Sequence, residues 1–300
     1  MSVTQITDAP DRTLTRSEAG RHPFTAVNIL GTLAGGYLPL IAATLIIALP
    51  LLWMIIGSLK APSEIVTQDL LLLPENPSLD AYGLAADRIP VGRLFLNSAV
   101  VTVAGSLIKL VLAVTTAYAL VFVRFPFKKV IFLAILVALM VPPQVALVPN
   151  YVLVAQLGGQ NTYWGIILPG LGTAFGTFLL RQHFLSIPRE ITEAAEIDGA
   201  HHPRRLAAII APISGPTIAT VALVTIVNEW NDYIWPLVIT DRPSMMTLPV
   251  GLTLLNNTEG NAGSYPVLMA GAVMVIVPVL IVFAALQRFI VAGLTQGAVK

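Results

Sequence analysis

Long apolar stretches separated by short polar ones run along most of this 300-residue chain. A helix that crosses a bilayer needs about 20 mostly apolar residues, and six stretches approach or exceed that length. They are residues 38–57, 97–122, 130–154, 164–180, 214–234 and 267–290. The pattern predicts an all-α integral membrane protein with six transmembrane helices.

The third stretch contains two adjacent prolines, Pro142 and Pro143. Proline removes a backbone donor and bends a helix, and the freed carbonyls need other partners in the membrane. Two interpretations stay open at this point. The prolines produce a simple kink, or they mark an irregular segment that lines a transport pathway with Gln144 and Asn150 facing it.

Composition supports the membrane assignment. Hydrophobic residues make up 56% of the chain and charged residues only 11%, whereas soluble domains carry roughly 25% charged residues, and the mean hydropathy is +0.80. The net charge of +1 argues against a nucleic-acid partner. The chain has no cysteine, which excludes disulfides, thiol nucleophiles and thiolate metal sites. Residues 1–22 are polar and are expected to form a flexible tail before the membrane domain, 23–300.

The distribution of Lys and Arg predicts the orientation, because these residues concentrate on the cytoplasmic side of membrane proteins. With both termini in the cytoplasm, twelve of them fall inside and four outside. This orientation places a loop at about 181–215 in the cytoplasm and the loop at about 58–96 outside. Lys109 is left within a span, where we expect it to point into the helix bundle or to snorkel; a role in transport is the alternative.

Within the cytoplasmic loop, residues 193–212 read "EAAEIDGAHHPRRLAAIIAP". Pro188 suits the first turn of a helix, acids follow where the helix dipole favours them, and Gly199 is a natural helix stop. We therefore expect a short helix, a glycine turn, and a second apolar helix from Leu206 that leads back to the membrane. A small protruding helix with alanines and glutamates suits docking into a groove of another protein.

The spacing in this loop resembles the cytoplasmic signature of bacterial ABC importer permeases. That signature is Glu-Ala-Ala, three residues, Gly, nine residues, Ile, any residue, Leu and Pro. Here residues 193–195, Gly199, Ile209 and Pro212 match it, and Ala211 stands where Leu is usual. The stretches "FLNSAVVT", "NEWNDYIWPL" and "FIVAGLTQGAVK" are similar to the carbohydrate-uptake branch, specifically its maltose-type second permease.

The resemblance implies a permease subunit in the bacterial inner membrane that imports a di- or oligosaccharide. It implies four kinds of partner: a second permease, two ATPase subunits, an extracytoplasmic sugar-binding protein and the lipid bilayer. No cofactor is expected on this chain, since ATP and Mg²⁺ would be bound by the ATPase. The residues expected to dock on the ATPase are Glu193, Ala194, Ala195, Asp198 and Gly199.

The stretch "NEWND" is the main candidate for substrate contact. Polar residues in a span are costly unless they face a cavity or the interface, and amides and acids beside aromatic rings suit sugars. Helical spacing puts Asn228, Asn231 and Asp232 on one face, with Trp230 directed toward lipid or a neighbouring helix. An aromatic belt at the outer interface is the alternative interpretation.

Other kinds of chemistry have little support. Neighbouring His201 and His202 would point about 100° apart on a helix, which makes a joint metal site improbable. No P-loop or nucleophile-elbow motif is present. Three alternatives remain: a permease for another solute such as glycerol phosphate, an intramembrane enzyme, and a secondary transporter. For glycerol phosphate, Lys109 would be the only basic group available in the pathway. A secondary transporter is disfavoured by the absence of an obvious inverted repeat.

Overall fold

The computed structural model describes residues 33–61, 64, 73–256 and 265–296. Over these residues the chain forms helices and turns and no strand, so the all-α prediction is confirmed. The predicted tail, residues 1–22, and the last residues, 297–300, lie outside the described part of the chain.

The helices follow one another with short connections. The first are η1 (Leu33–Tyr37), α2 (Leu38–Ser58), α4 (Asp80–Arg88), α5 (Val91–Phe122), α6 (Lys128–Met140), η2 (Pro143–Ala146), α7 (Leu147–Gln156), α8 (Tyr163–Ile167), η3 (Leu168–Leu171) and α9 (Ala174–Leu185). The remainder are α10 (Arg189–Ile197), α11 (His202–Arg205), η4 (Leu206–Ile210), α12 (Ala211–Ile213), α13 (Gly215–Asn231), α14 (Ile234–Ile239), α15 (Leu248–Asn256) and α16 (Tyr265–Gln296).

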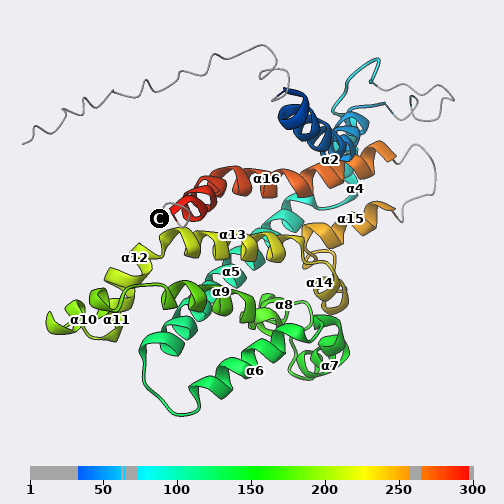
Figure 1. The fold of residues 1–300 in the computed structure, drawn as a ribbon. Coiled ribbons are helices and arrows are strands. Elements are labelled where there is room, and N and C mark those ends of the chain that lie inside the picture. The colour runs from blue at the N-terminus through cyan, green and yellow to red at the C-terminus, as the bar shows by residue number, and fades with distance from the viewer. Residues whose placement is uncertain (1–32, 62–63, 65–72, 257–264, 297–300) are drawn as a thin grey trace, which may run out of the picture. The chain divides into compact units, whose positions relative to one another are not determined.

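The chain divides into two compact units, 1–51 and 52–300, and the division falls within α2. In the second unit α5 is the central helix, because it packs against α9 and α13, while α13 also packs against α16 (Figure 1). Small side chains allow this close packing. Ala113 and Ala117 of α5 are fully buried against Leu180 of α9 and Val221 of α13.

Three of the predicted spans appear as single long helices, and three are broken. The continuous ones are Gly35–Ser58, Val91–Phe122 and Tyr265–Gln287. The others are pairs of helices that bend by 91°, 46° and 85° at short breaks. If each bent pair is one span, the described residues contain up to six, which is compatible with the six predicted ones.

The 91° bend lies at the two prolines of the third stretch, between α6 and α7. Pro142 is extended, with ψ of 130°, and Pro143 begins the short 3-10 turn η2. A bend of this size turns α7 nearly perpendicular to α6, so the interpretation as a simple kink is wrong. The irregular backbone that the second interpretation expected is confined to the break at 141–142 and the 3-10 turn η2, after which the regular helix α7 begins.

Candidate functional site

The loop at about 181–215, which was predicted to be cytoplasmic, contains the predicted short helix, α10. It begins directly after Pro188 and ends before a turn at Gly199, whose φ is +72°. Gly199 N–H donates to Glu196 O at 3.0 Å, and Ala200 N–H donates to Ala195 O at 2.9 Å. These two bonds are the pair that defines a Schellman motif, in which glycine supplies the left-handed residue. The predicted glycine stop is confirmed.

The expected docking residues do not all face outward. Glu193, Ala194 and Asp198 are exposed, whereas Ala195 is only 4% exposed. Ala195 therefore packs α10 onto the loop. Ile197 is 87% exposed, an unusual state for a large apolar side chain on a helix outside the apolar spans. The outward face of α10 thus combines two apolar side chains with two acids.

The basic stretch after the turn anchors this loop. The second helix begins at His202 and not at Leu206 as the sequence suggested, so the basic residues are helical. Arg205 is buried and pairs with Glu196 of α10. His202 Nδ1 lies 3.0 Å from the hydroxyl of Tyr118, near the end of α5, and the two rings meet edge to face. These contacts fix α10 to the central helix, and His202 is engaged with Tyr118 rather than with a second histidine.

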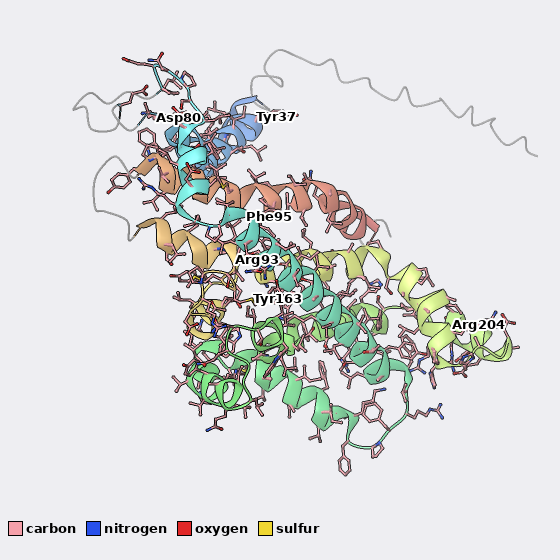
Figure 2. The ribbon with its side chains drawn as sticks, turned by 180° about the vertical axis from the view of Figure 1, so that it is seen from behind. Tyr37, Asp80, Arg93, Phe95, Tyr163 and Arg204 are labelled. Atoms are coloured by element: carbon pink, nitrogen blue, oxygen red, sulfur yellow. The ribbon has the colours of Figure 1, made fainter. Side chains whose placement is uncertain are left out.

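At the other end of α5, the buried side chain of Asn97 joins three segments. Its amide donates to Ser244 O and Met246 O, both at 2.9 Å, and its carbonyl oxygen accepts from Tyr163 Oη at 2.8 Å. Leu248 N–H donates to the neighbouring Ser98 hydroxyl at 2.8 Å. These bonds give the Asn-Ser pair of "FLNSAVVT" a structural role. In Figure 2, Tyr163 lies toward this end of α5 and Arg204 toward the other.

A pocket of about 570 Å³ lies where η2, α7, η3 and the break after α13 come together. Four of the five residues proposed for the substrate pathway line it: Gln144, Asn150, Asn231 and Asp232. They come from segments more than 70 residues apart in the sequence. The rest of the lining consists of Pro143, Leu147, Pro169, Gly170, Tyr233, Ile234 and Trp235.

Asn228 is the exception among the five, because it does not line the pocket. The prediction of one continuous helical face was wrong, since α13 ends at Asn231 and Asp232 is already extended, with ψ of 124°. The break, and not helical spacing, brings Asn231 and Asp232 into the pocket. Trp230 points to a neighbouring helix, one of the two expected outcomes: its indole N–H donates to Val275 O of α16 at 2.9 Å.

Aromatic residues of the pocket are held in place from behind. The indole N–H of Trp235 donates to Ile166 O at 3.0 Å and lies 3.2 Å from Gly165 O. The ring is therefore fixed against α8 while Trp235 lines the pocket. An anchored aromatic ring beside amides and one carboxylate is the combination that suits a polyhydroxy ligand.

Lys109 forms an ion pair with Glu229, which the sequence analysis did not predict. The expectation that Lys109 points into the bundle is confirmed. The partner could have been found from the sequence, because Glu229 and Asp232 are the only acids within the predicted spans. The described residues contain no group of three or more His, Cys, Asp or Glu side chains that could hold a metal ion.

Comparison with known proteins agrees with this architecture. The family described as "Binding-protein-dependent transport system inner membrane component" matches residues 109–296. The sn-glycerol-3-phosphate transport system permease protein UgpE of Brucella suis is 34% identical over 268 residues, covering 87% of this chain and 95% of its own. The arabinooligosaccharides transport system permease protein AraQ of Halalkalibacterium halodurans is 34% identical over 254 residues, covering 84% and 90%.

A crystal structure of a bacterial ABC transporter involved in the import of the acidic polysaccharide alginate contains a chain of the same fold. The TM-score is 0.77 at 24% identity, and the match covers 88% of this chain and 98% of that one. The family match extends over more than half of the sequence and includes the loop at about 181–215, α13 and all of α16. The chain therefore belongs to the inner membrane components of binding-protein-dependent transport systems.

Proposed function

We propose that this chain is one of two permease subunits of an ATP-driven importer for a sugar, and that it forms half of the translocation pathway. The observation that carries the proposal is the outward face of α10, with Ile197 87% exposed and a glycine turn that fixes the end of the helix. The relatives AraQ and UgpE, which are named for the transport of arabinooligosaccharides and of sn-glycerol 3-phosphate, support a sugar or a related polyol as the solute.

The outward face of α10 is suited to a cleft with an apolar floor and basic edges. Burying a side chain such as Ile197 stabilises a complex by about 1.5–3 kcal/mol. Glu193 and Asp198 would pair with arginine or lysine of the partner, and such pairs set orientation more than affinity. The ATPase subunits would supply this cleft, and they would bind ATP and Mg²⁺.

The central helix provides the link between ATP hydrolysis and the outer side. With 32 residues, α5 is about 48 Å long at 1.5 Å per residue, which exceeds the roughly 30 Å of the hydrocarbon core. Tyr118 connects one end to the docking loop, and Asn97 connects the other to the segment at 244–246. A tilt of α10 would therefore be transmitted through α5 and would move the contacts of Asn97 with residues 244–246.

The remaining partners follow from this arrangement. A second permease would complete the pathway, and an extracytoplasmic sugar-binding protein would deliver the solute to the side where Asn97 and Tyr163 lie. Both termini would be cytoplasmic, in agreement with the excess of Lys and Arg on that side. The pocket with Asn231 and Asp232 would be the part of the pathway that this subunit lines.

Docking by α10 is tested with two variants, Glu193→Lys and Ile197→Glu, in the complex with all its subunits. We expect both to reduce co-purification of the ATPase and uptake, while the amount of permease in the membrane is unchanged. Lys129→Glu is the control, because it changes an exposed charge outside α10. Normal ATPase retention and uptake in both α10 variants would refute the docking proposal.

A further inference from the structure

The ion pair of Lys109 and Glu229 lies in the interior of the second unit. It joins α5 to α13, and the two side chains are only 15% and 13% exposed. Lys109 is near the middle of α5, 18 residues after Val91, which corresponds to about 27 Å along the helix. An unpaired charge at such a depth is costly, so each residue needs the other.

Two glycines bring this pair close to the pocket. A Cβ atom at Gly105, one turn before Lys109, would lie 2.5 Å from Glu229 Oε2, so the missing side chain provides the space for the carboxylate. A Cβ atom at Gly170 would lie 3.3 Å from Lys109 Nζ. Gly170 lines the pocket. The ammonium group of Lys109 therefore lies next to Gly170, a residue of the pocket lining.

The charges around the pocket are unequal. Among the described residues, the lining contains the carboxylate of Asp232 and no Lys or Arg. The nearest cation, Lys109, is compensated by Glu229. Lys109, Glu229 and Asp232 together carry a net charge of −1, so a negatively charged solute would meet repulsion and not an anchor.

Resting on the proposed function, we propose that this pocket accepts uncharged polyhydroxy solutes and disfavours phosphorylated or carboxylated ones, because Glu229 masks Lys109. The relative UgpE is named for the transport of sn-glycerol 3-phosphate, an anionic solute. The proposal therefore predicts that this chain differs from UgpE in the charge of the solute it accepts. At roughly 8 Å and an effective dielectric constant of about 20, one uncompensated charge changes the occupancy of a monovalent ion about 30-fold.

The charge of the pocket can be measured without knowledge of the natural solute. The chain contains no cysteine, so Gln144→Cys places a single thiol of this subunit in the pocket lining. In membranes that contain the whole complex, the thiol is treated with one of two methanethiosulfonate reagents. One carries a trimethylammonium group and is cationic, and the other carries a sulfonate group and is anionic. The rate of labelling of this subunit is measured with each. Relative to a free thiol in solution, we expect the cationic reagent to react about 30-fold faster and the anionic one about 30-fold slower, a ratio of about 1,000.

Three further changes in the Gln144→Cys background identify the source of the charge. Glu229→Gln unmasks Lys109 and should shift the ratio of the two rates about 1,000-fold toward the anionic reagent, about 30-fold for each reagent. Lys109→Gln combined with Glu229→Gln removes both charges and should leave the ratio near its original value. Asp232→Asn should also shift the ratio toward the anionic reagent, and it retains the ion pair if the Glu229 variant fails to assemble.

Two results would overturn the inference. One is equal or faster reaction with the anionic reagent in the chain that carries only Gln144→Cys. The other is the same ratio in the single Glu229 variant and in the double variant. Uptake of the reconstituted system after complete modification of the thiol tests the pathway separately. Undiminished uptake would refute the proposed location of the pathway and leave the measured charge of the pocket intact.

Discussion

Gly199 offers a sharp test of coupling, because its conformation can be separated from its contacts. Its φ is +72°, yet a Cβ atom added there would have no other atom within 4 Å. A larger residue is therefore resisted only by its backbone conformation. A left-handed conformation costs an L-residue such as Ala about 1–2 kcal/mol. Asn tolerates this conformation better than Ala, and a β-branched residue such as Val tolerates it less well than Ala.

This cost lowers the population of the intact turn about 5- to 30-fold in Gly199→Ala, because 1.36 kcal/mol corresponds to a factor of ten. We expect uptake to fall in the order Gly, Asn, Ala, Val. The assay is uptake by the reconstituted complex, together with its ATPase activity and the amount of permease in the membrane. Uptake should fall while the amount of permease stays constant, since the turn lies outside the packed spans.

The matched variant is Gly199→Asn, which adds a side chain but tolerates the same φ. If Asn impairs uptake as much as Val, the size of the side chain matters and the conformational argument is wrong. If Val transports as well as Gly, the turn is not needed for coupling, and the Schellman bonds of α10 have only a local role.

Three other changes test different parts of the molecule. Asn231→Ala and Asp232→Ala should raise the solute concentration for half-maximal uptake without reducing assembly of the complex. Asn228 lies outside the pocket, so Asn228→Ala should leave that concentration unchanged. Poor assembly of the Asn231 and Asp232 variants would show that these residues are structural. Trp230→Phe removes the donor to Val275 O and should destabilise the complex by about 1 kcal/mol, measurable as a lower temperature of thermal unfolding; an unchanged temperature would show that this bond contributes nothing. A reporter that is active only outside the cytoplasm, fused after the last residue, should be silent, and a strong signal would reverse the assigned orientation.

The helices and the loop could be predicted because they depend on local patterns. The apolar stretches gave α2, α5 and α16 to within a few residues at most ends, and Gly199 marked the end of α10. These features follow from the length of an apolar run and from the conformation of one glycine. Residues near them in the sequence are sufficient to produce them.

The break at the end of α13 was harder to predict than the one at Pro142 and Pro143, because tertiary contacts help to decide it. The local signal at the end of α13 is Pro236, which has no N–H for the carbonyl of Asp232 four residues earlier, and it does not fix the last helical residue as Gly199 does for α10. The helix ends there nevertheless, and the break turns Asp232 rather than Asn228 into the pocket. The second helix of the loop begins at His202 because Tyr118 and Glu196 engage its basic residues. Tyr118 lies 84 residues from His202 in the chain, and Glu196 lies 9 residues from Arg205.

The bonds of Asn97 impose an order on the biosynthesis of the chain. Its amide is buried, and the carbonyls that accept from it belong to residues 147 and 149 positions later. At a translation rate of roughly 5–20 residues per second, those residues emerge roughly 7–30 s after Asn97. During that interval α5 has been made, but the amide N–H groups of Asn97 lack the two carbonyls that finally accept from them. A ribosome that stalls before Ser244 leaves a chain in which the Asn97 amide has neither of these two acceptors, so the contact between α5 and residues 244–246 can form only in the nearly complete chain.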